Sequence, residues 1–233
     1  MDICNNRDYI DGSSFWQNFA FRIWSHICLK TIGATVFMSL FFIAYFYLLK
    51  NPFFAVIQIK TNTIDDIVGF VPVFIYFYLS LWVYVSLPPI LIKSRKELIS
   101  YGFYVGALCV SGIVFYALIP TAVPPYAVDW SSHPEFSFLR SVDMSGNAFP
   151  SMHVATALFS WAWLHRELKE MKASHITLAI SAAWCLGIIY STMATKQHVF
   201  YDVVGGVVLG GLFAFLTLRD YNKRFILKAK PLR

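Results

Sequence analysis

Long apolar stretches separated by short polar ones dominate the pattern along the chain. A helix of about 20 apolar residues is long enough to cross a bilayer. The stretches are nearly free of charge, and they cover residues 31–49, 67–92, 98–119, 149–164, 176–194 and 198–218. The pattern therefore predicts an all-α, integral membrane bundle of six transmembrane helices. The second stretch is long enough to tilt or to kink at Pro72, Pro88 or Pro89.

A different pattern precedes the first of these stretches, over residues 13–27. Trp16, Phe19, Ile23 and Ile27 recur at helical spacing, with polar side chains between them. Such spacing is typical of a short amphipathic helix that lies in the membrane interface. The alternative is that these residues only begin the first transmembrane helix.

The composition agrees with a membrane protein and excludes other classes. Of the 233 residues, 58% are hydrophobic and 14% are charged, whereas soluble domains carry about 25% charged residues. A disordered chain, a coiled coil and a soluble enzyme are therefore disfavoured. We expect residues 1–30 to form a cytoplasmic N-terminus with the interfacial helix, residues 31–218 the membrane domain, and residues 219–233 a basic cytoplasmic tail.

The positive charge of the chain predicts its orientation. The net charge is +6, and 15 of the 19 Lys and Arg residues fall on the side of the two termini. The positive-inside rule places that side in the cytoplasm, so the basic residues are topology signals and no nucleic-acid partner is expected. The polar loop 120–150 and the turn 195–198 then face the exoplasm, which is the periplasm if the membrane is a bacterial inner membrane.

Candidate chemistry begins with a stripe on the last apolar stretch. His198 and Asp202 are four residues apart, and the same step continues to Gly206 and Gly210. Glycines at this spacing let another helix approach closely, so the polar pair is expected to point into the bundle. A carboxylate beside an imidazole fixes its tautomer and raises its basicity. The alternative is a buried polar pair that only fixes helix packing.

A second histidine is expected at the same membrane face. His153 follows Pro150 and Ser151, which favour a helix start, and a helix N-terminus attracts anions such as phosphate. Together with His198 and Asp202 it predicts a phosphoryl-transfer site. Two alternatives are a locally bonded loop histidine and a zinc site with these three ligands.

These residues resemble a known family. Residues 149–153 read Phe-Pro-Ser-Met-His, which resembles the Pro-Ser-x-His second motif of the type 2 phosphatidic acid phosphatase superfamily. Ser191, His198 and Asp202 keep the spacing of its third motif, Ser-Arg-x5-His-x3-Asp, with Thr192 in place of arginine. The resemblance implies a six-span, metal-independent enzyme without a cofactor.

The resemblance also implies roles for the residues that match. His198 would be the nucleophile that forms a phosphohistidine, Asp202 its orienting carboxylate, and His153 the acid that protonates the leaving oxygen. The similarity extends over about residues 116–211, and residues 120–125 are similar to a branch that includes inositol phosphorylceramide synthase-like proteins.

The sequence departs from the family where the phosphate is held. The first motif, Lys-x6-Arg-Pro, is absent, and no Lys or Arg lies between Lys96 and Arg140. Lys196 is therefore the predicted phosphate ligand, with Arg140 as the other basic candidate on this part of the exoplasmic face. The remaining predicted substrate-binding residues are Ser151, Thr192, Tyr116 and Gln197.

The function expected from this reading is hydrolysis of a lipid phosphomonoester or diphosphate at the exoplasmic leaflet. The expected partners are the phosphorylated lipid and the bilayer. Two alternatives stay open, namely transfer of the phosphate-bearing head group to an acceptor alcohol and a transporter that uses the polar pair as a relay.

Overall fold

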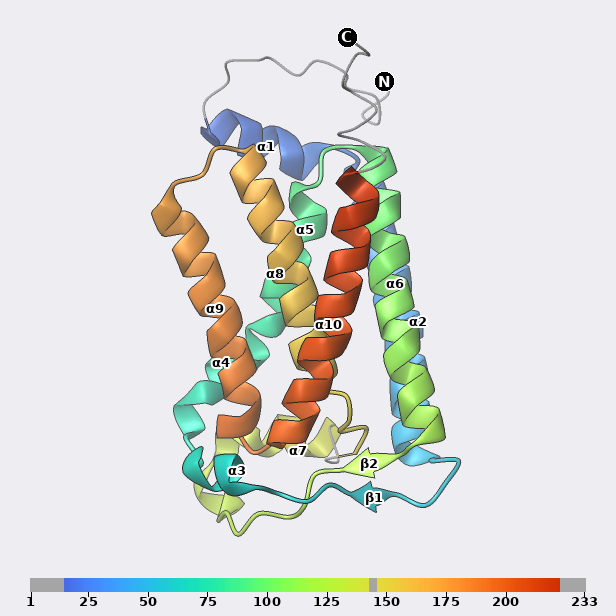
Figure 1. Ribbon diagram of the computed structural model, residues 1–233, viewed down its shortest axis with the longest axis vertical. Helices are drawn as coiled ribbons and strands as arrows, with labels where there is room; N and C mark the ends of the chain where they lie inside the picture. Colours follow the sequence, from blue (N-terminus) through green and yellow to red (C-terminus); the bar gives the residue numbers. More distant parts are fainter. Residues whose placement is uncertain (1–14, 143–145, 223–233) are drawn as a thin grey trace.

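The computed structural model describes residues 15–142 and 146–222, and within them the chain is almost entirely helical (Figure 1). The long helices run along one axis, and short elements gather at one end. The elements are α1 (Phe15–Trp24), α2 (Ile27–Lys50), β1 (Ile57–Gln58), α3 (Thr63–Ile67), η1 (Pro72–Phe74), α4 (Ile75–Leu79), α5 (Leu81–Leu91), α6 (Arg95–Leu118), β2 (Thr121–Ala122), η2 (Trp130–Ser132), η3 (Pro134–Phe136), α7 (Ser137–Val142), α8 (Met152–Glu170), α9 (His175–Ala194) and α10 (Phe200–Tyr221).

Several helices are long and apolar enough to cross a membrane, so the chain is an integral membrane protein. Among the described residues there are five, namely Ile27–Lys50, Pro72–Leu91, Arg95–Leu118, His175–Ala194 and Phe200–Tyr221. The remaining expected stretch, residues 149–164, corresponds to α8, which is 19 residues long. Its last turns carry Arg166, Glu167, Lys169 and Glu170, and these charges lower its mean hydropathy.

The helix expected over residues 67–92 begins later than the apolar pattern does. Residues 63–67 form the separate helix α3, and the following segment is irregular up to Pro72. Proline disfavours a helical conformation in the residue before it and suits the first position of a helix. Pro88 and Pro89 lie inside α5, near its end at Leu91.

Helix α8 is the centre of the bundle and packs against α5, α6, α9 and α10. Its contact with α10 depends on two glycines. A Cβ added to Gly206 would lie 2.5 Å from the carbonyl oxygen of Ser151, and one added to Gly210 would meet the backbone of Ala155. The prediction that this stripe admits a closely packed helix is confirmed.

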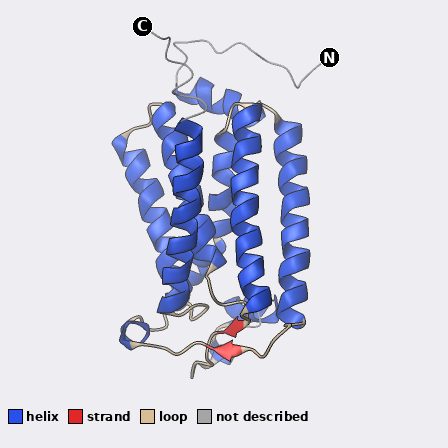
Figure 2. Ribbon diagram, turned by 45° about the vertical axis from the view of Figure 1, so that its right-hand side comes forward, coloured by secondary structure: helices blue, strands red, loops and turns tan. Residues whose placement is uncertain are grey.

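At one end of the bundle, two short strands lie side by side (Figure 2), and a third connecting segment joins them by a backbone bridge. Strands β1 and β2 are parallel, with Ile57 opposite Thr121 and Gln58 opposite Ala122. Ala122 also forms an antiparallel bridge with Gly146. The segment before α8 is thereby tied to the end of α6, and α3 and α7 lie at the same end.

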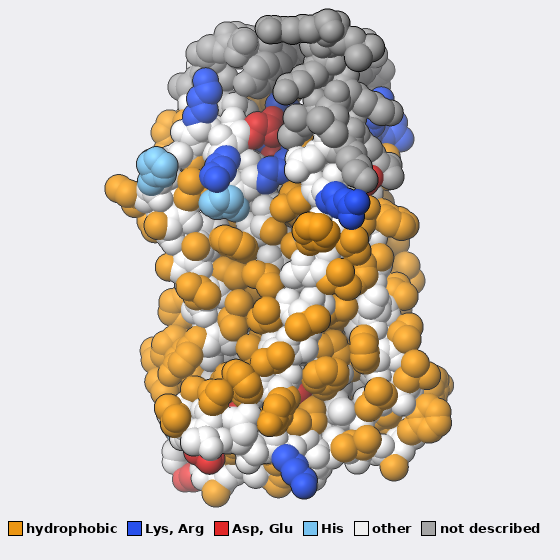
Figure 3. Space-filling view, viewed as in Figure 1, with side chains coloured by type: hydrophobic (Ala, Val, Ile, Leu, Met, Phe, Trp, Pro, Cys, Tyr) orange, Lys and Arg blue, Asp and Glu red, His pale blue; other side chains and the backbone are white. Residues whose placement is uncertain are grey.

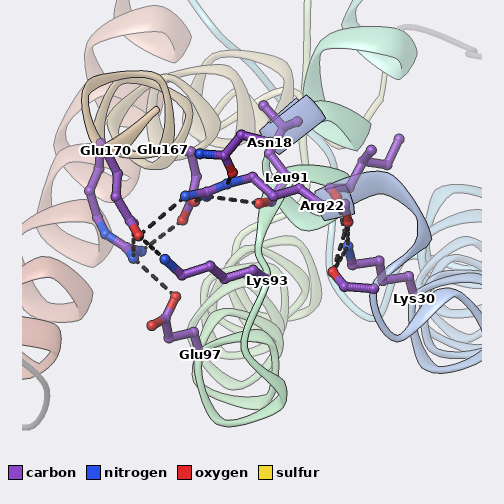
Figure 4. Close-up of polar contacts among 11 residues, drawn as sticks. Asn18, Arg22, Lys30, Leu91, Lys93, Glu97, Glu167 and Glu170 are labelled. Atoms are coloured by element: carbon purple, nitrogen blue, oxygen red, sulfur yellow. Dashed lines mark hydrogen bonds and ion pairs between the residues drawn. The ribbon is translucent and has the colours of Figure 1, made fainter. Parts of the chain in front are cut away.

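The opposite end carries a network of buried charges, in which Arg22 of α1 is the central residue (Figure 4). The side chains of Arg22 and Glu167 are almost fully buried and form an ion pair. Arg22 Nε donates to Asn18 Oδ1 at 2.9 Å, and Nη1 donates to the carbonyl oxygen of Leu91 at 3.1 Å. Arg22 Nη2 lies 3.2 Å from Glu170 Oε1. These contacts hold α1 across the end of the bundle, next to the last turns of α8.

The described chain begins and ends at this charged end, at α1 and at the end of α10 (Figure 1). Figure 3 shows a broad hydrophobic band around the middle of the visible face, with Lys and Arg side chains mostly near α1. A band of this kind suits contact with lipid. Residues 1–14 of the expected N-terminal segment, and residues 223–233 of the expected basic tail, lie outside the described residues.

Candidate active site

His198 and Asp202 meet at the start of α10. His198 lies just before the first helical residues, and its Nδ1 is 3.4 Å from Asp202 Oδ2. The same carboxylate oxygen accepts the backbone N–H of Val199 at 3.0 Å. Asp202 is fully buried and His198 is 7% exposed. Because Nδ1 faces the carboxylate, Nε2 is the ring nitrogen available to a substrate.

His153 faces His198 from the first turn of α8. The centroids of the two imidazole rings are 6.0 Å apart. Tyr78 of α4 stacks on His153 with a centroid distance of 4.2 Å, and its hydroxyl lies 3.4 Å from His153 Nδ1. The tyrosine therefore fixes the plane of the imidazole and occupies one of its nitrogens. The other nitrogen is left for chemistry.

The helix starts that carry the two histidines are bonded to each other. The backbone N–H of Ser151 donates to the carbonyl oxygen of Asp202 at 3.0 Å. The hydroxyl of Ser151 accepts from the N–H of Val154, so Ser151 is the N-cap of α8 as its type predicts. The N–H groups of Met152 and His153 belong to the first helical turn, which has no intrahelical acceptors. They are the amides that can meet an anion at this point.

The turn between α9 and α10 is held by Thr192. Its carbonyl oxygen accepts from the N–H of Gln197 at 3.1 Å and of His198 at 3.0 Å, while its hydroxyl donates to the carbonyl of Ile189. Ser191 is buried beside it and donates to Ile188. Gln197 Nε2 donates within the turn to Thr195. These contacts position His198 through the backbone.

Lys196 lies in the same turn with a left-handed backbone (φ 59°). Its ammonium donates to the carbonyl oxygen of Asp65 at 3.1 Å and to that of Val68, and it lies 4.8 Å from the centroid of the Tyr126 ring. Burial lowers the pKa of Lys196, and the nearby carboxylates Asp65 and Asp66 oppose that shift. In this structure Lys196 ties the turn to α3.

Of the other predicted substrate-binding residues, Arg140 is exposed and Tyr116 is buried. Arg140 is exposed on α7, with its guanidinium 5.0 Å from the centroid of the Trp130 ring. Tyr116 is buried at the end of α6, and its hydroxyl donates to the carbonyl oxygen of Pro150 at 2.8 Å. Tyr116 therefore supports the segment before His153. Arg140 does not line the cavity that contains the two histidines.

A large cavity reaches the two histidines. It has a volume of about 1120 Å³ and lies among α2, α5, α6 and α8. His153, His198, Tyr116 and Asn147 line one end, and the walls are formed mainly by apolar and aromatic side chains. Asn147 Nδ2 donates to the carbonyl of Tyr45 and thereby connects this end to α2. The site can take a molecule with a small polar head and a large apolar part.

Two residues of the site, Tyr78 and Asp65, are not predicted from the sequence. Tyr78 stands in an apolar stretch where a tyrosine carries no recognisable signal. Asp65 of α3 accepts the N–H of Phe200 at 2.7 Å and so caps α10 beside His198. Asn62 and Asp65 form a capping box, and this three-residue spacing is a signal that marks a helix start.

Metal ligation was the alternative use of His153, His198 and Asp202. Within residues 15–142 and 146–222, no group of three or more His, Cys, Asp or Glu side chains is arranged to hold a metal ion. The arrangement present is one imidazole with a carboxylate on its Nδ1, a second imidazole across a gap, and a helix N-terminus. Such a set can provide a nucleophile, a proton donor and amide groups for an anion.

The comparisons with known proteins agree with this chemistry. The family model described as the PAP2 superfamily matches residues 98–226, a range that contains His153, His198 and Asp202. Neither a curated protein nor a solved structure matches the chain.

Proposed function

Because the chain belongs to the PAP2 superfamily, we propose that it is a lipid phosphatase that acts through a phosphohistidine. The superfamily generally comprises phosphoesterases and phosphotransferases. The observation that carries the proposal is the pairing of His198 with Asp202, opposite His153, at the end of a large apolar cavity. The substrate class is a phosphomonoester or diphosphate on a membrane lipid, and no metal takes part.

The proposed reaction has two steps. Nε2 of His198 attacks the phosphorus, the bond from phosphorus to the lipid oxygen breaks, and His153 gives a proton to that oxygen. Water then attacks the phosphohistidine, the phosphorus–nitrogen bond breaks, and His153 takes the proton from the water. Asp202 stabilises the positive charge that develops on the ring of His198.

Phosphate is held in this proposal mainly by amides and by one cation. The first-turn N–H groups at Met152 and His153 bind its oxygens. Lys196 supplies the positive charge, which requires its ammonium to leave one of its carbonyl partners when the substrate arrives. Ser151, Thr192, Tyr116 and Gln197 shape the site through the backbone contacts described above, and Arg140 contributes less than Lys196.

The proposed topology has six spans, with α8 as the sixth. Helix α8 is long enough to cross, and it packs against α5, α6, α9 and α10, with its polar residues Ser160 and Glu167 buried. Helix α1 then lies in the cytoplasmic interface, and the two histidines lie at the exoplasmic face. This orientation rests on the excess of Lys and Arg on the side of α1.

Release of phosphate from a lipid phosphate by the purified chain tests the proposal. The wild type is compared with His198→Ala and with His165→Ala, which removes a histidine on α8 that does not line the cavity. We expect turnover in the wild type and in His165→Ala and none in His198→Ala. Equal turnover in all three proteins would contradict the proposal.

Transfer of the head group to an acceptor alcohol is the second candidate function. It is favoured by the similarity of residues 120–125 to the branch with inositol phosphorylceramide synthase-like proteins. The same assay with an added polyol separates the two, because a transferase forms a new phosphorylated product and releases little inorganic phosphate. A transporter would release no phosphate and form no new product.

A further inference from the structure

The cavity extends far beyond the site. Along α2 it is lined by residues from Ile27, near the charged end, to Tyr45 and Phe46, near the histidines. Ile27 and Tyr45 are 18 residues apart on one helix, which corresponds to about 27 Å at 1.5 Å per residue. The hydrocarbon core of a bilayer is about 30 Å thick, so one leaflet is about half of that. The cavity is therefore about as long as the whole bilayer core is thick.

The walls leave this space open because α2 contacts the rest of the bundle along only part of its surface. Of its 24 residues, the buried ones are Lys30 and Leu48. Phe42 of α2 and Trp82 of α5 contact each other, with ring centroids 5.3 Å apart. Two glycines line the half of the cavity that is distant from the histidines, Gly33 on α2 and Gly102 on α6. A Cβ added at either glycine meets no atom within 4 Å.

The cation that lines the distant end is already bonded within the protein. Lys30 lies there, and its ammonium donates to the carbonyl oxygens of Arg22 and Ile90, both at 2.6 Å. Its hydrogen-bonding capacity is thus used within the protein. An occupant that starts at the histidines would continue as an apolar chain to this end.

Resting on the function proposed above, we infer that this cavity selects the substrate by the length of its tail. The preferred substrate carries its phosphate on an apolar chain that is longer than one leaflet is deep, as a long polyprenyl or alkyl phosphate does. Gly33 and Gly102 determine this specificity, because the absence of side chains there lets the chain pass. A lipid with tails of one-leaflet length fills only the half of the cavity next to the histidines.

The test uses the full-length chain in detergent with two substrates that share one head group, farnesyl phosphate and a polyprenyl phosphate several times longer. Phosphate release gives kcat/KM for each. The wild type is expected to prefer the long substrate. Gly102→Leu and Gly33→Leu place a side chain in the empty half of the cavity, and each should lower kcat/KM for the long substrate about ten-fold or more. Turnover of farnesyl phosphate should be unchanged.

Gly211→Leu is the matched control. It makes the same replacement on α10, away from the cavity, where an added Cβ lies 3.8 Å from Leu158. Each replacement exchanges glycine for a better helix former, so folding is favoured. We expect the control to leave the ratio of the two kcat/KM values as in the wild type.

The outcomes separate this inference from the proposed function. If the wild type hydrolyses both substrates equally, or if Gly102→Leu slows both to the same extent, tail selection is refuted while the phosphatase stands. If the wild type releases no phosphate from either, the proposed function is refuted. In that case, binding of a non-hydrolysable polyprenyl phosphonate still tests whether the cavity holds a long tail. Undiminished binding by Gly102→Leu and Gly33→Leu would refute tail selection.

Discussion

Replacement of Asp202 by asparagine isolates the contribution of one negative charge. In the structure both donors, His198 Nδ1 and the N–H of Val199, point at the same oxygen of Asp202. An asparagine side chain can keep its carbonyl oxygen at that position and accept from both. The tautomer of His198 and the N-terminus of α10 are then preserved, and only the carboxylate charge is lost.

The size of the effect follows from the distance. Two unit charges about 4 Å apart interact by about 4 kcal/mol at an effective dielectric constant of about 20. Asp202 is fully buried, so solvent screens the pair little. If the ring of His198 becomes positive as its Nε2 attacks, Asp202→Asn should slow phosphoenzyme formation about 10³-fold. Asp202→Ala should form the phosphoenzyme at least as slowly and should also lose about 1 kcal/mol of stability, because the hydrogen bond from the N–H of Val199 at the start of α10 is lost.

The assay is acid quench followed by mass spectrometry of the phosphorylated peptide, with thermal unfolding measured in parallel. We expect a phosphate on His198 in the wild type and slow accumulation of the same adduct in Asp202→Asn, with an unchanged melting temperature. A loss below ten-fold in the well-folded variant would show that no charge develops next to Asp202. A phosphate on His153 would reverse the roles of the two histidines.

Three further predictions concern other parts of the chain. Lys196→Ala should lower kcat/KM about 10²- to 10³-fold and Arg140→Ala only slightly, as measured by phosphate release; equal losses would assign the phosphate to both cations. In a background without native cysteines, Glu135→Cys should react with an impermeant thiol reagent in intact cells and His175→Cys only after lysis, and the opposite pattern would invert the topology. Arg22→Met should lower the free energy of unfolding by about 1.5–3 kcal/mol, since buried Glu167 then keeps Arg166 as its only cationic partner among the ion pairs described; a change below 1 kcal/mol in denaturant titration would refute the network's role.

Much of the helical layout could be predicted because apolar length is a strong signal. The stretches 98–119, 176–194 and 198–218 correspond closely to α6, α9 and α10. For the stretch 67–92 the predicted start of the helix is too early. Its first residues are apolar, but they precede Pro72 and lie outside the transmembrane helix. Helix α8 does not meet the hydropathy criterion for a membrane span, because its last turns carry four charged residues.

The geometry of the candidate site can be predicted where a residue type has a definite chemical meaning. His198 and Asp202 were predicted to share one face and do lie in contact. The position of Lys196 was harder to foresee, because sequence spacing does not reveal that the carbonyls of Asp65 and Val68 are close to its ammonium. Tyr78 lies 75 residues before His153, and such a tertiary contact leaves no local pattern.

The low hydropathy of α8 has a consequence for how the protein is made. A helix that lacks a continuous apolar surface partitions weakly into the bilayer by itself, and two of its neighbours, α9 and α10, are synthesised after it. We expect α8 to become fully inserted only when α10 docks through Gly206 and Gly210. A chain that stops before α10 should show partial insertion of α8, which glycosylation mapping during synthesis measures, and complete insertion would contradict this order. Since α8 supplies His153 and the start of α10 supplies His198, the two histidines can meet only after α10 has been synthesised.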